Sequence, residues 1–215
     1  MTRHEEIAQN LRDVQSRIGS ADVTLIAVTK TYPVSDVQIL KDLGINNFGE
    51  NRTEEGGEKS SEVDGIWHFQ GGIQSRKLKE IAQWADVIHS LDQLSHAQKL
   101  EALLTKPIDV FLQLSLDGDP SRGGVRREDL NSLAQKVSEL PHLNLQGIMC
   151  VLPLEVDPHD GFRKVGEIHT QFQSEFPEAK YLSAGMSGDF EIAIEYGATH
   201  IRVGSQILGP RTARR

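Results

Sequence analysis

A lysine follows the first strongly apolar run of the chain, where an amine could act as a nucleophile. The run begins at residue 25 and leads to Lys30, and Pro33 prevents its continuation as a paired strand. Alternate side chains of a strand share a face, so Lys30 points to the same side as Ile26 and Val28. An amine at the mouth of a core is partly desolvated, its pKa falls, and the neutral form can attack a carbonyl carbon to make a Schiff base. A solvated lysine that merely ends a strand is the competing interpretation.

Two segments near the C-terminus have the composition of an anion site. Residues 185–189 read Gly-Met-Ser-Gly-Asp, and residues 202–206 read Arg-Val-Gly-Ser-Gln. The hydroxyls of Ser187 and Ser205 and the free backbone N–H groups suit a phosphate, and Gly204 lets the phosphate approach the backbone. Arg202 precedes Gly204 by two residues and shares its side of the strand, so it lies beside this site or forms a salt bridge at the rim.

Other polar side chains have a structural and a functional interpretation that the sequence leaves open. His68 lies in an apolar run and is either a hydrogen-bonded core histidine or a ligand contact. Asn51 follows Phe-Gly-Glu and either caps a helix or lines a site. Residues 74–77 are most simply a capped helix start, and Arg122, in the turn-rich segment 117–124, is expected to be solvated.

Strand and helix patterns alternate along the chain, which implies parallel strands joined by helices. An amphipathic helix over residues 4–18 comes first. The strands expected after it are residues 25–30, 45–50, 66–71, 86–91, 108–116, 145–151, 181–184 and 200–204. We predict one α/β domain over residues 1–215, a closed (β/α)8 barrel of the TIM type with an extra N-terminal helix, whose site lies at the C-terminal strand ends. An open doubly wound sheet is the alternative, although the first half lacks a Gly-x-Gly-x-x-Gly turn.

One helix of this scheme is expected to be weak. It spans about residues 52–61 and contains the adjacent Gly56 and Gly57. Two glycines cost a helix about 2 kcal/mol relative to two alanines.

The composition is that of an ordinary globular protein and argues against several classes of function. Of the 215 residues, 38% are hydrophobic and 25% are charged, and the net charge of −8 argues against nucleic-acid binding. No apolar run approaches membrane-spanning length, and the N-terminus lacks the apolar core of a signal peptide. The single cysteine, Cys150, lies in an apolar run and fits a buried thiol in a reducing compartment. We expect a cytoplasmic protein that binds neither nucleic acid nor membrane, with the basic residues 211–215 as a frayed tail.

Five segments resemble motifs of the pyridoxal-phosphate homeostasis protein family, in order and without large gaps from about residue 5 to residue 211. They are Val-Thr-Lys-Thr-Tyr-Pro at 28–33, Phe-Gly-Glu-Asn at 48–51, Trp-His-Phe-Gln-Gly at 67–71, Gly-Met-Ser at 185–187 and Arg-Val-Gly-Ser at 202–205. Members of that family are single-barrel proteins similar to the N-terminal domain of alanine racemase. Residues 71–77 and Arg122 depart from the family pattern, which leaves open any role of that rim as a second cofactor site or a docking site.

The resemblance implies that pyridoxal 5′-phosphate is the cofactor and that Lys30 forms its aldimine. It also implies that Arg202 faces the pyridine nitrogen, and that Asn51 and His68 lie around the cofactor. The phosphate is then held by Ser187, Gly204 and Ser205.

The resemblance further implies a carrier that buffers pyridoxal phosphate and delivers it to dependent apoenzymes, and we expect a monomer without amino-acid turnover. An amino-acid racemase and a Schiff-base aldolase are the alternatives. Racemisation needs an acid–base group on each face of the substrate. In alanine racemase the second group comes from a C-terminal β domain, which we do not expect in a chain ending at Arg215. Arginine at the pyridine nitrogen also disfavours ring protonation. Aldolases of this kind usually carry their lysine on a later strand than Lys30.

Overall fold

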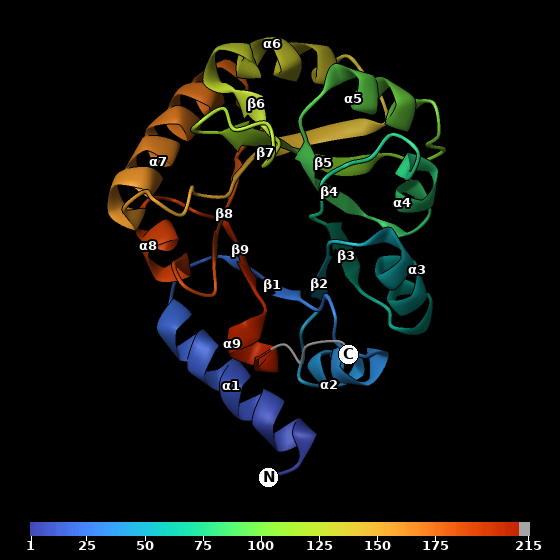
Figure 1. The fold of residues 1–215 in the computed structure, drawn as a ribbon, viewed down its shortest axis with the longest axis vertical. Coiled ribbons are helices and arrows are strands. Elements are labelled where there is room, and N and C mark those ends of the chain that lie inside the picture. Colours follow the sequence, from blue (N-terminus) through green and yellow to red (C-terminus); the bar gives the residue numbers. More distant parts are fainter. Residues whose placement is uncertain (211–215) are drawn as a thin grey trace.

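Within residues 1–210, the part of the chain that the structure describes, all the strands run parallel to their neighbours, and eight of them close into a ring (Figure 1). The computed structural model describes residues 1–210, and the basic segment 211–215 lies outside the described residues. The strands are β1 (Thr24–Val28), β2 (Asn47–Glu50), β3 (Ile66–Phe69), β4 (Val87–Leu91), β5 (Ile108–Ser115), β6 (Val125–Arg126), β7 (Leu143–Cys150), β8 (Tyr181–Met186) and β9 (His200–Val203). Pairing of β1 with β9 and of β4 with β5 closes the ring, which excludes the open sheet. The predicted barrel is confirmed, and the short β6, which pairs only with β5, is an addition that its turn-like sequence did not predict.

Helices surround the strands as an outer layer (Figure 1). They are α1 (Arg3–Ile18), α2 (Val34–Asp42), α3 (Thr53–Glu62), α4 (Leu78–Trp84), α5 (Leu94–Glu101), α6 (Arg127–Ser138), α7 (Pro158–Glu175), α8 (Phe190–Glu195) and α9 (Ser205–Leu208). The extra N-terminal helix α1 begins with a capping box between Thr2 and Glu5 and buries Ile7, Leu11 and Val14. It packs against α9 and α2, so the first and last helices lie together. Within residues 1–210, no helix combines the length and apolar character needed to cross a membrane.

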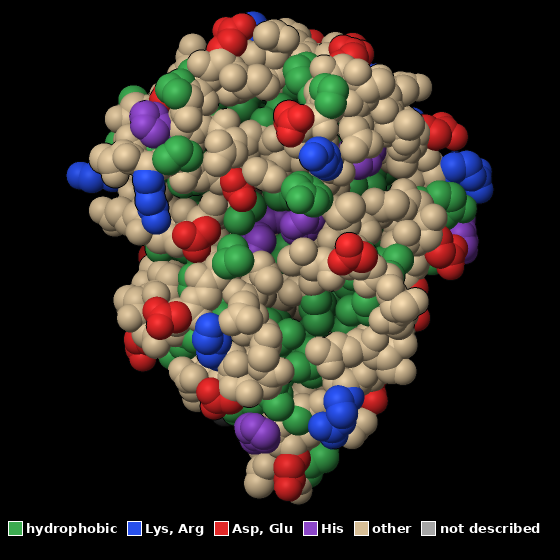
Figure 2. Space-filling view, turned by 180° about the vertical axis from the view of Figure 1, so that it is seen from behind, with side chains coloured by type: hydrophobic (Ala, Val, Ile, Leu, Met, Phe, Trp, Pro, Cys, Tyr) green, Lys and Arg blue, Asp and Glu red, His purple; other side chains and the backbone are tan. Residues whose placement is uncertain are grey.

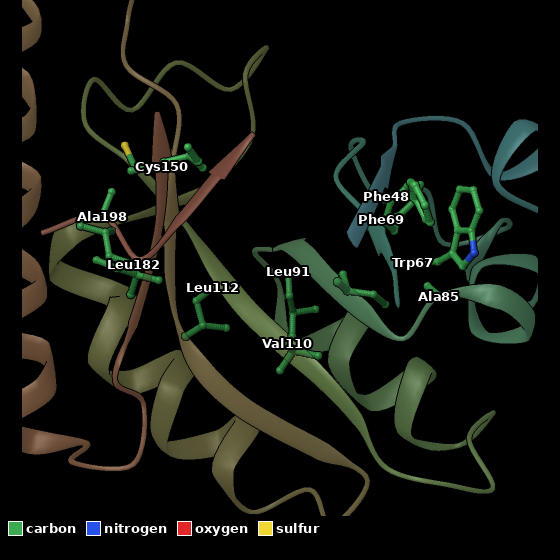
Figure 3. Packing of buried hydrophobic residues seen from close by; sticks show 14 of the residues in the cluster. Phe48, Trp67, Phe69, Ala85, Leu91, Val110, Leu112, Cys150, Leu182 and Ala198 are labelled. Carbon is green, nitrogen blue, oxygen red and sulfur yellow. The ribbon is translucent and has the colours of Figure 1, made fainter. Parts of the chain in front are cut away.

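The alternation of side chains along each strand separates an outer core from the barrel interior. On β5, the buried Val110, Leu112 and Leu114 belong to the large cluster between strands and helices, part of which Figure 3 shows. Phe111, between them, belongs instead to a small separate cluster with Val87 and Met149. The interior is therefore lined by a second set of side chains, and these form the cavities described below.

The helix that was expected to be weak forms over the predicted residues, as α3 (Thr53–Glu62). Gly56 permits close packing against α4, because a Cβ atom at this position would lie 2.3 Å from the ring of Trp84. The indole nitrogen of Trp84 donates a hydrogen bond to Thr53 Oγ1 at 3.1 Å, at the start of α3. Contact between neighbouring helices thus offsets the low helix propensity of glycine.

Candidate functional site

A cavity of about 240 Å³ opens at the C-terminal ends of β1, β8 and β9. The predicted site residues that the structure brings together there are Lys30, Asn51, Ser187, Arg202, Gly204 and Ser205. The side chains that complete the wall are largely apolar or neutral, and Lys30 and Arg202 are the charged residues among the described lining. A cavity with two cationic groups and several hydroxyl and backbone donors is suited to an anionic ligand.

Lys30 lies two residues beyond the end of β1 and is half-buried. Both Val28 and Lys30 line the cavity, as strand alternation predicts. The chain turns sharply after the lysine, because Thr31 has a φ angle of 73°, which places it in the left-handed region. Lys30 therefore lies at the point where the strand ends and the chain changes direction.

Arg202 enters the cavity from within the barrel and is only 5% exposed. Its guanidinium donates to Ser183 Oγ at 2.6 Å and to the carbonyl oxygen of Cys150 at 2.9 Å. Both acceptors are neutral and lie inside the barrel. Arg202 is therefore held by interior hydrogen bonds, and not by the salt bridge at the rim that was the alternative interpretation. Burial lowers the pKa of Arg202 to about 10, which still leaves the group charged at neutral pH, and burial raises the pKa of the Cys150 thiol to about 12.

A chain of buried hydrogen bonds continues from Arg202 along the barrel interior. Ser183 Oγ lies 2.8 Å from His89 Nδ1, and His89 Nε2 lies 2.9 Å from His68 Nδ1. His68 Nε2 in turn lies 3.0 Å from Asn47 Oδ1. Arg202 can only donate, so Ser183 Oγ accepts from it and its own hydroxyl donates a hydrogen bond to His89 Nδ1. Each histidine then accepts at Nδ1 and donates from Nε2, and the chain ends on an amide oxygen that can only accept.

Burial keeps these histidines neutral. Desolvation, with a smaller contribution from the charge of His200, lowers the pKa of His68 to about 3. The pKa of His89 is lowered well below its ordinary value, chiefly by burial. His200, at the same end of the interior as His68, has its pKa lowered to about 4, again mainly by burial.

The structure does not bring His68 to the cavity that contains Lys30. Its side chain lines a separate cavity of about 230 Å³, together with His200 and Phe111. Figure 2, which views the barrel from the end opposite to Figure 1, shows histidine side chains in a central hollow. His68 shares its face of β3 with Gln70, and being two residues earlier it lies deeper in the barrel. Gln70, to which sequence reasoning gave no role, lines the Lys30 cavity instead; strand periodicity puts it on the face of His68 but does not say which of the two reaches the cavity.

The residues after β8 and β9 form one side of the cavity. The backbone N–H of Gly204 donates to Ser187 Oγ at 3.3 Å, which joins the two segments. A Cβ atom on Gly204 would lie 3.0 Å from the carbonyl oxygen of Val28, so a larger residue would press on β1. The backbones of Asn51 and Gly71 also approach each other closely, because a Cβ atom on Gly71 would lie 2.0 Å from the carbonyl oxygen of Asn51.

A larger cavity of about 530 Å³ adjoins this site and shares Gln70, Met149 and Val151 with it. Arg122 forms part of its wall and, contrary to expectation, is not simply solvated. Its guanidinium donates to the carbonyl oxygens of Val151 at 2.9 Å and Leu152 at 2.7 Å. Arg122 therefore ties the segment after β5 to the segment after β7.

Comparison with known proteins places this chain in a family. The alanine racemase N-terminal domain family matches residues 3–212. A pyridoxal phosphate homeostasis protein of Corynebacterium glutamicum is 40% identical over 200 residues, covering 88% of this chain and 90% of the relative. One from Escherichia coli is 34% identical over 227 residues, covering 96% of this chain and 97% of the relative.

Solved structures of known proteins have a similar fold. PipY of Synechococcus elongatus, in a structure with PLP bound, has a TM-score of 0.86 at 31% identity, covering 94% of this chain and all (100%) of that chain. Alanine racemase from Corynebacterium glutamicum has a TM-score of 0.79 at 15% identity, covering 98% of this chain and 63% of that chain, which is a likeness of fold alone. This chain therefore belongs to the pyridoxal phosphate homeostasis protein family, within the wider family of alanine racemase N-terminal domains.

Proposed function

We propose that the chain binds pyridoxal 5′-phosphate in the Lys30 cavity and takes part in cytoplasmic pyridoxal phosphate homeostasis, holding the cofactor and passing it to dependent apoenzymes. The observation that carries the proposal is the lining of the cavity: one amine, one buried guanidinium and two serine hydroxyls at the C-terminal strand ends, without a carboxylate among the described lining residues. The PLP-bound structure of PipY, a 31% identical neighbour, supports it.

The donor set suits each part of the cofactor. Ser187, Ser205 and the backbone at Gly204 would hold the phosphate, and the charged Arg202 would lie towards the pyridine ring. Pyridoxal phosphate supplies an aldehyde, and Lys30 Nζ is the amine we propose to bond to its carbon with loss of water. We assign His68 no contact with the cofactor, because it lies in the separate cavity described above.

We further propose that the protein holds the cofactor without turning over amino acids. Proton transfer at an amino-acid Cα requires a base on each side for racemisation. Lys30 could serve one side, and the remaining described lining offers Arg202, serines, amides and apolar groups. A buried guanidinium beside the ring also disfavours the ring proton that makes the cofactor a strong electron sink.

Covalent capture tests the assignment of Lys30. The protein is incubated with pyridoxal 5′-phosphate, reduced with borohydride and mapped by peptide mass spectrometry. We expect a visible absorbance before reduction and label on Lys30, loss of both in Lys30→Met, and retention of both in Lys41→Met, a change at a partly exposed lysine of α2 that does not line the cavity. Label on another lysine, or none, would contradict the proposal.

Delivery and lack of turnover need separate assays. The loaded protein should restore activity to a pyridoxal-phosphate-dependent apoenzyme, and it should sediment as a monomer. With L-alanine in deuterated water we expect little deuterium at Cα and no D-alanine. D-Alanine formed at about 1 s⁻¹ or faster, an ordinary enzymatic rate, would make the protein a racemase.

A further inference from the structure

The residues on both sides of Lys30 form hydrogen bonds with charged side chains outside the cavity, of which Glu50 and Lys59 are buried and Glu55 is partly buried. Thr29, which is fully buried, donates from its hydroxyl to Glu50 Oε1 at 2.6 Å. Its carbonyl oxygen accepts a hydrogen bond from Lys59 Nζ at 2.7 Å, and its backbone N–H donates to the carbonyl of Gly49 at 2.9 Å. Every polar group of Thr29 is thus used to hold the chain immediately before Lys30.

The residue after Lys30 is held in an unfavourable conformation. Thr31 has a φ of 73° and is the single non-glycine residue at positive φ in the described part of the chain. For a β-branched residue this region is strained and persists only where the surroundings impose it. The backbone N–H of Thr31 donates to Glu55 Oε2 at 2.7 Å, so a side chain of α3 contacts the backbone at the strained residue.

One turn of α3 supplies both restraints. Lys59 is 3% exposed, and its Nζ lies 2.5 Å from Glu50 Oε1 and 3.6 Å from Glu55 Oε2. Glu55 and Lys59 are four residues apart on α3, so they project from the same face of the helix. Neither residue lines the cavity. The Lys59–Glu50 ion pair is deeply buried, and such pairs add little to the free energy of unfolding. We therefore attribute to it a role in fixing the local structure.

We propose that Glu55 and Lys59 are positioning residues that fix the backbone on both sides of Lys30 and so aim its amine at the cofactor aldehyde. This inference rests on the proposed function. A lysine side chain has four rotatable bonds, and a fixed Cα–Cβ direction limits where its amine can reach. Misplacement of a reacting atom by about 1 Å can reduce a rate about 100-fold, whereas non-covalent binding of the phosphate and ring does not depend on the amine.

The test compares covalent capture with non-covalent binding in matched variants. Glu55→Ala removes the acceptor of the Thr31 N–H, and Glu55→Gln keeps an acceptor oxygen while removing the charge. Glu54→Ala is the control, because Glu54 is the preceding residue of α3, is 66% exposed and pairs with Lys77 instead. For each variant we measure the rate at which pyridoxal 5′-phosphate develops visible absorbance, and the Kd of pyridoxine 5′-phosphate, which carries the phosphate but has no aldehyde.

We expect Glu55→Ala to slow covalent capture about 10-fold or more, a conservative share of the 100-fold above, while the Kd of pyridoxine 5′-phosphate changes less than twofold. Glu55→Gln should recover most of the rate, and Glu54→Ala should match the parent in both measurements. Equal capture rates in Glu55→Ala and the parent, or equal losses for both ligands, would overturn the positioning role.

A second variant guards against misfolding of Glu55→Ala. Thr31→Gly accepts the positive φ without strain, so the double variant Glu55→Ala/Thr31→Gly carries no backbone strain at this position while no Glu55 contact holds the residue there. Capture in this double variant should be several-fold slower than in the parent, although its free energy of unfolding does not fall below that of Glu55→Ala. Capture at the parental rate in this double variant would count against the inference. If the parent itself takes up no cofactor at Lys30, the proposed function fails and this inference fails with it; if the parent reacts and the variants match it, only the positioning role is wrong.

Discussion

The buried histidines of the barrel interior should make the protein sensitive to mild acid. A histidine whose pKa is lower in the folded than in the unfolded state stabilises the fold at pH values above its unfolded pKa, and this stability is lost as the pH falls towards the folded pKa. For His68 the folded pKa is about 3, and for His200 it is about 4. The unfolded pKa is about 6.5, so the window of loss opens just below neutrality.

The size of the effect follows from these values. Between pH 7 and pH 5 each of the two histidines costs the fold about 2 kcal/mol, because the unfolded chain takes up a proton that the folded chain excludes. His89 acts in the same direction, since its pKa is also lowered by burial. Glu50 acts in the opposite direction, because burial raises its pKa. A loss of about 4 kcal/mol is a large share of the 5–15 kcal/mol that stabilises a typical domain.

Urea unfolding at pH 7 and pH 5, followed by tryptophan fluorescence, measures the loss. His68→Gln removes one titrating group, so its loss between the two pH values should be smaller than the parent's by about 2 kcal/mol. His4→Gln, at an exposed position on α1, should behave as the parent. A parent that loses less than about 1 kcal/mol, or a His68→Gln protein that loses as much as the parent, would refute the reasoning.

Two further predictions concern the packing of α3 and the anion site. Gly57→Ala should stabilise the fold by about 0.5–1 kcal/mol, because its nearest neighbour would lie 3.7 Å from the new methyl group, whereas Gly56→Ala should destabilise it by about 1–2 kcal/mol because its methyl would lie 2.3 Å from the ring of Trp84. Urea titrations of both variants check this, and equal signs would contradict it. Replacing Ser187 and Ser205 together by alanine should weaken pyridoxal 5′-phosphate binding by about 2–4 kcal/mol and leave binding of pyridoxal, which lacks the phosphate, nearly unchanged. Equal losses for both ligands in equilibrium titrations would show that the serines act on folding.

Local pattern was sufficient to predict most of the elements and the relative placement of neighbours on one strand. The period of two along a strand places Lys30 on the side of Val28 and Arg202 on the side of Gly204, and all four line one cavity. Alternating strands and helices, together with the family motifs, predicted the barrel. These predictions depend on residues close in sequence, whose geometry the backbone alone specifies.

Local sequence pattern could not predict how deep a side chain lies in the barrel, or which residues distant in sequence contact each other. His68 and Gln70 share a face, but only the stagger of the closed barrel places one in the Lys30 cavity and the other in a separate cavity. By sequence Gly56 only weakens α3, but in the fold it gives room to the ring of Trp84, 28 positions away in the printed sequence.

The contacts on both sides of Lys30 are the clearest example of a feature that the sequence pattern could not predict. Glu55 and Lys59 read as ordinary charged residues of an exposed helix, yet Lys59 is 3% exposed and bonds to the carbonyl oxygen of Thr29. The sequence pattern of α3 does not indicate that Lys59 is buried, because the oxygen atoms that Lys59 Nζ binds belong to Glu50 of β2 and to Thr29, directly after β1. A charged side chain becomes a buried structural contact only when packing brings a partner to it, and that partner is set by the way the strands and helices close around one another.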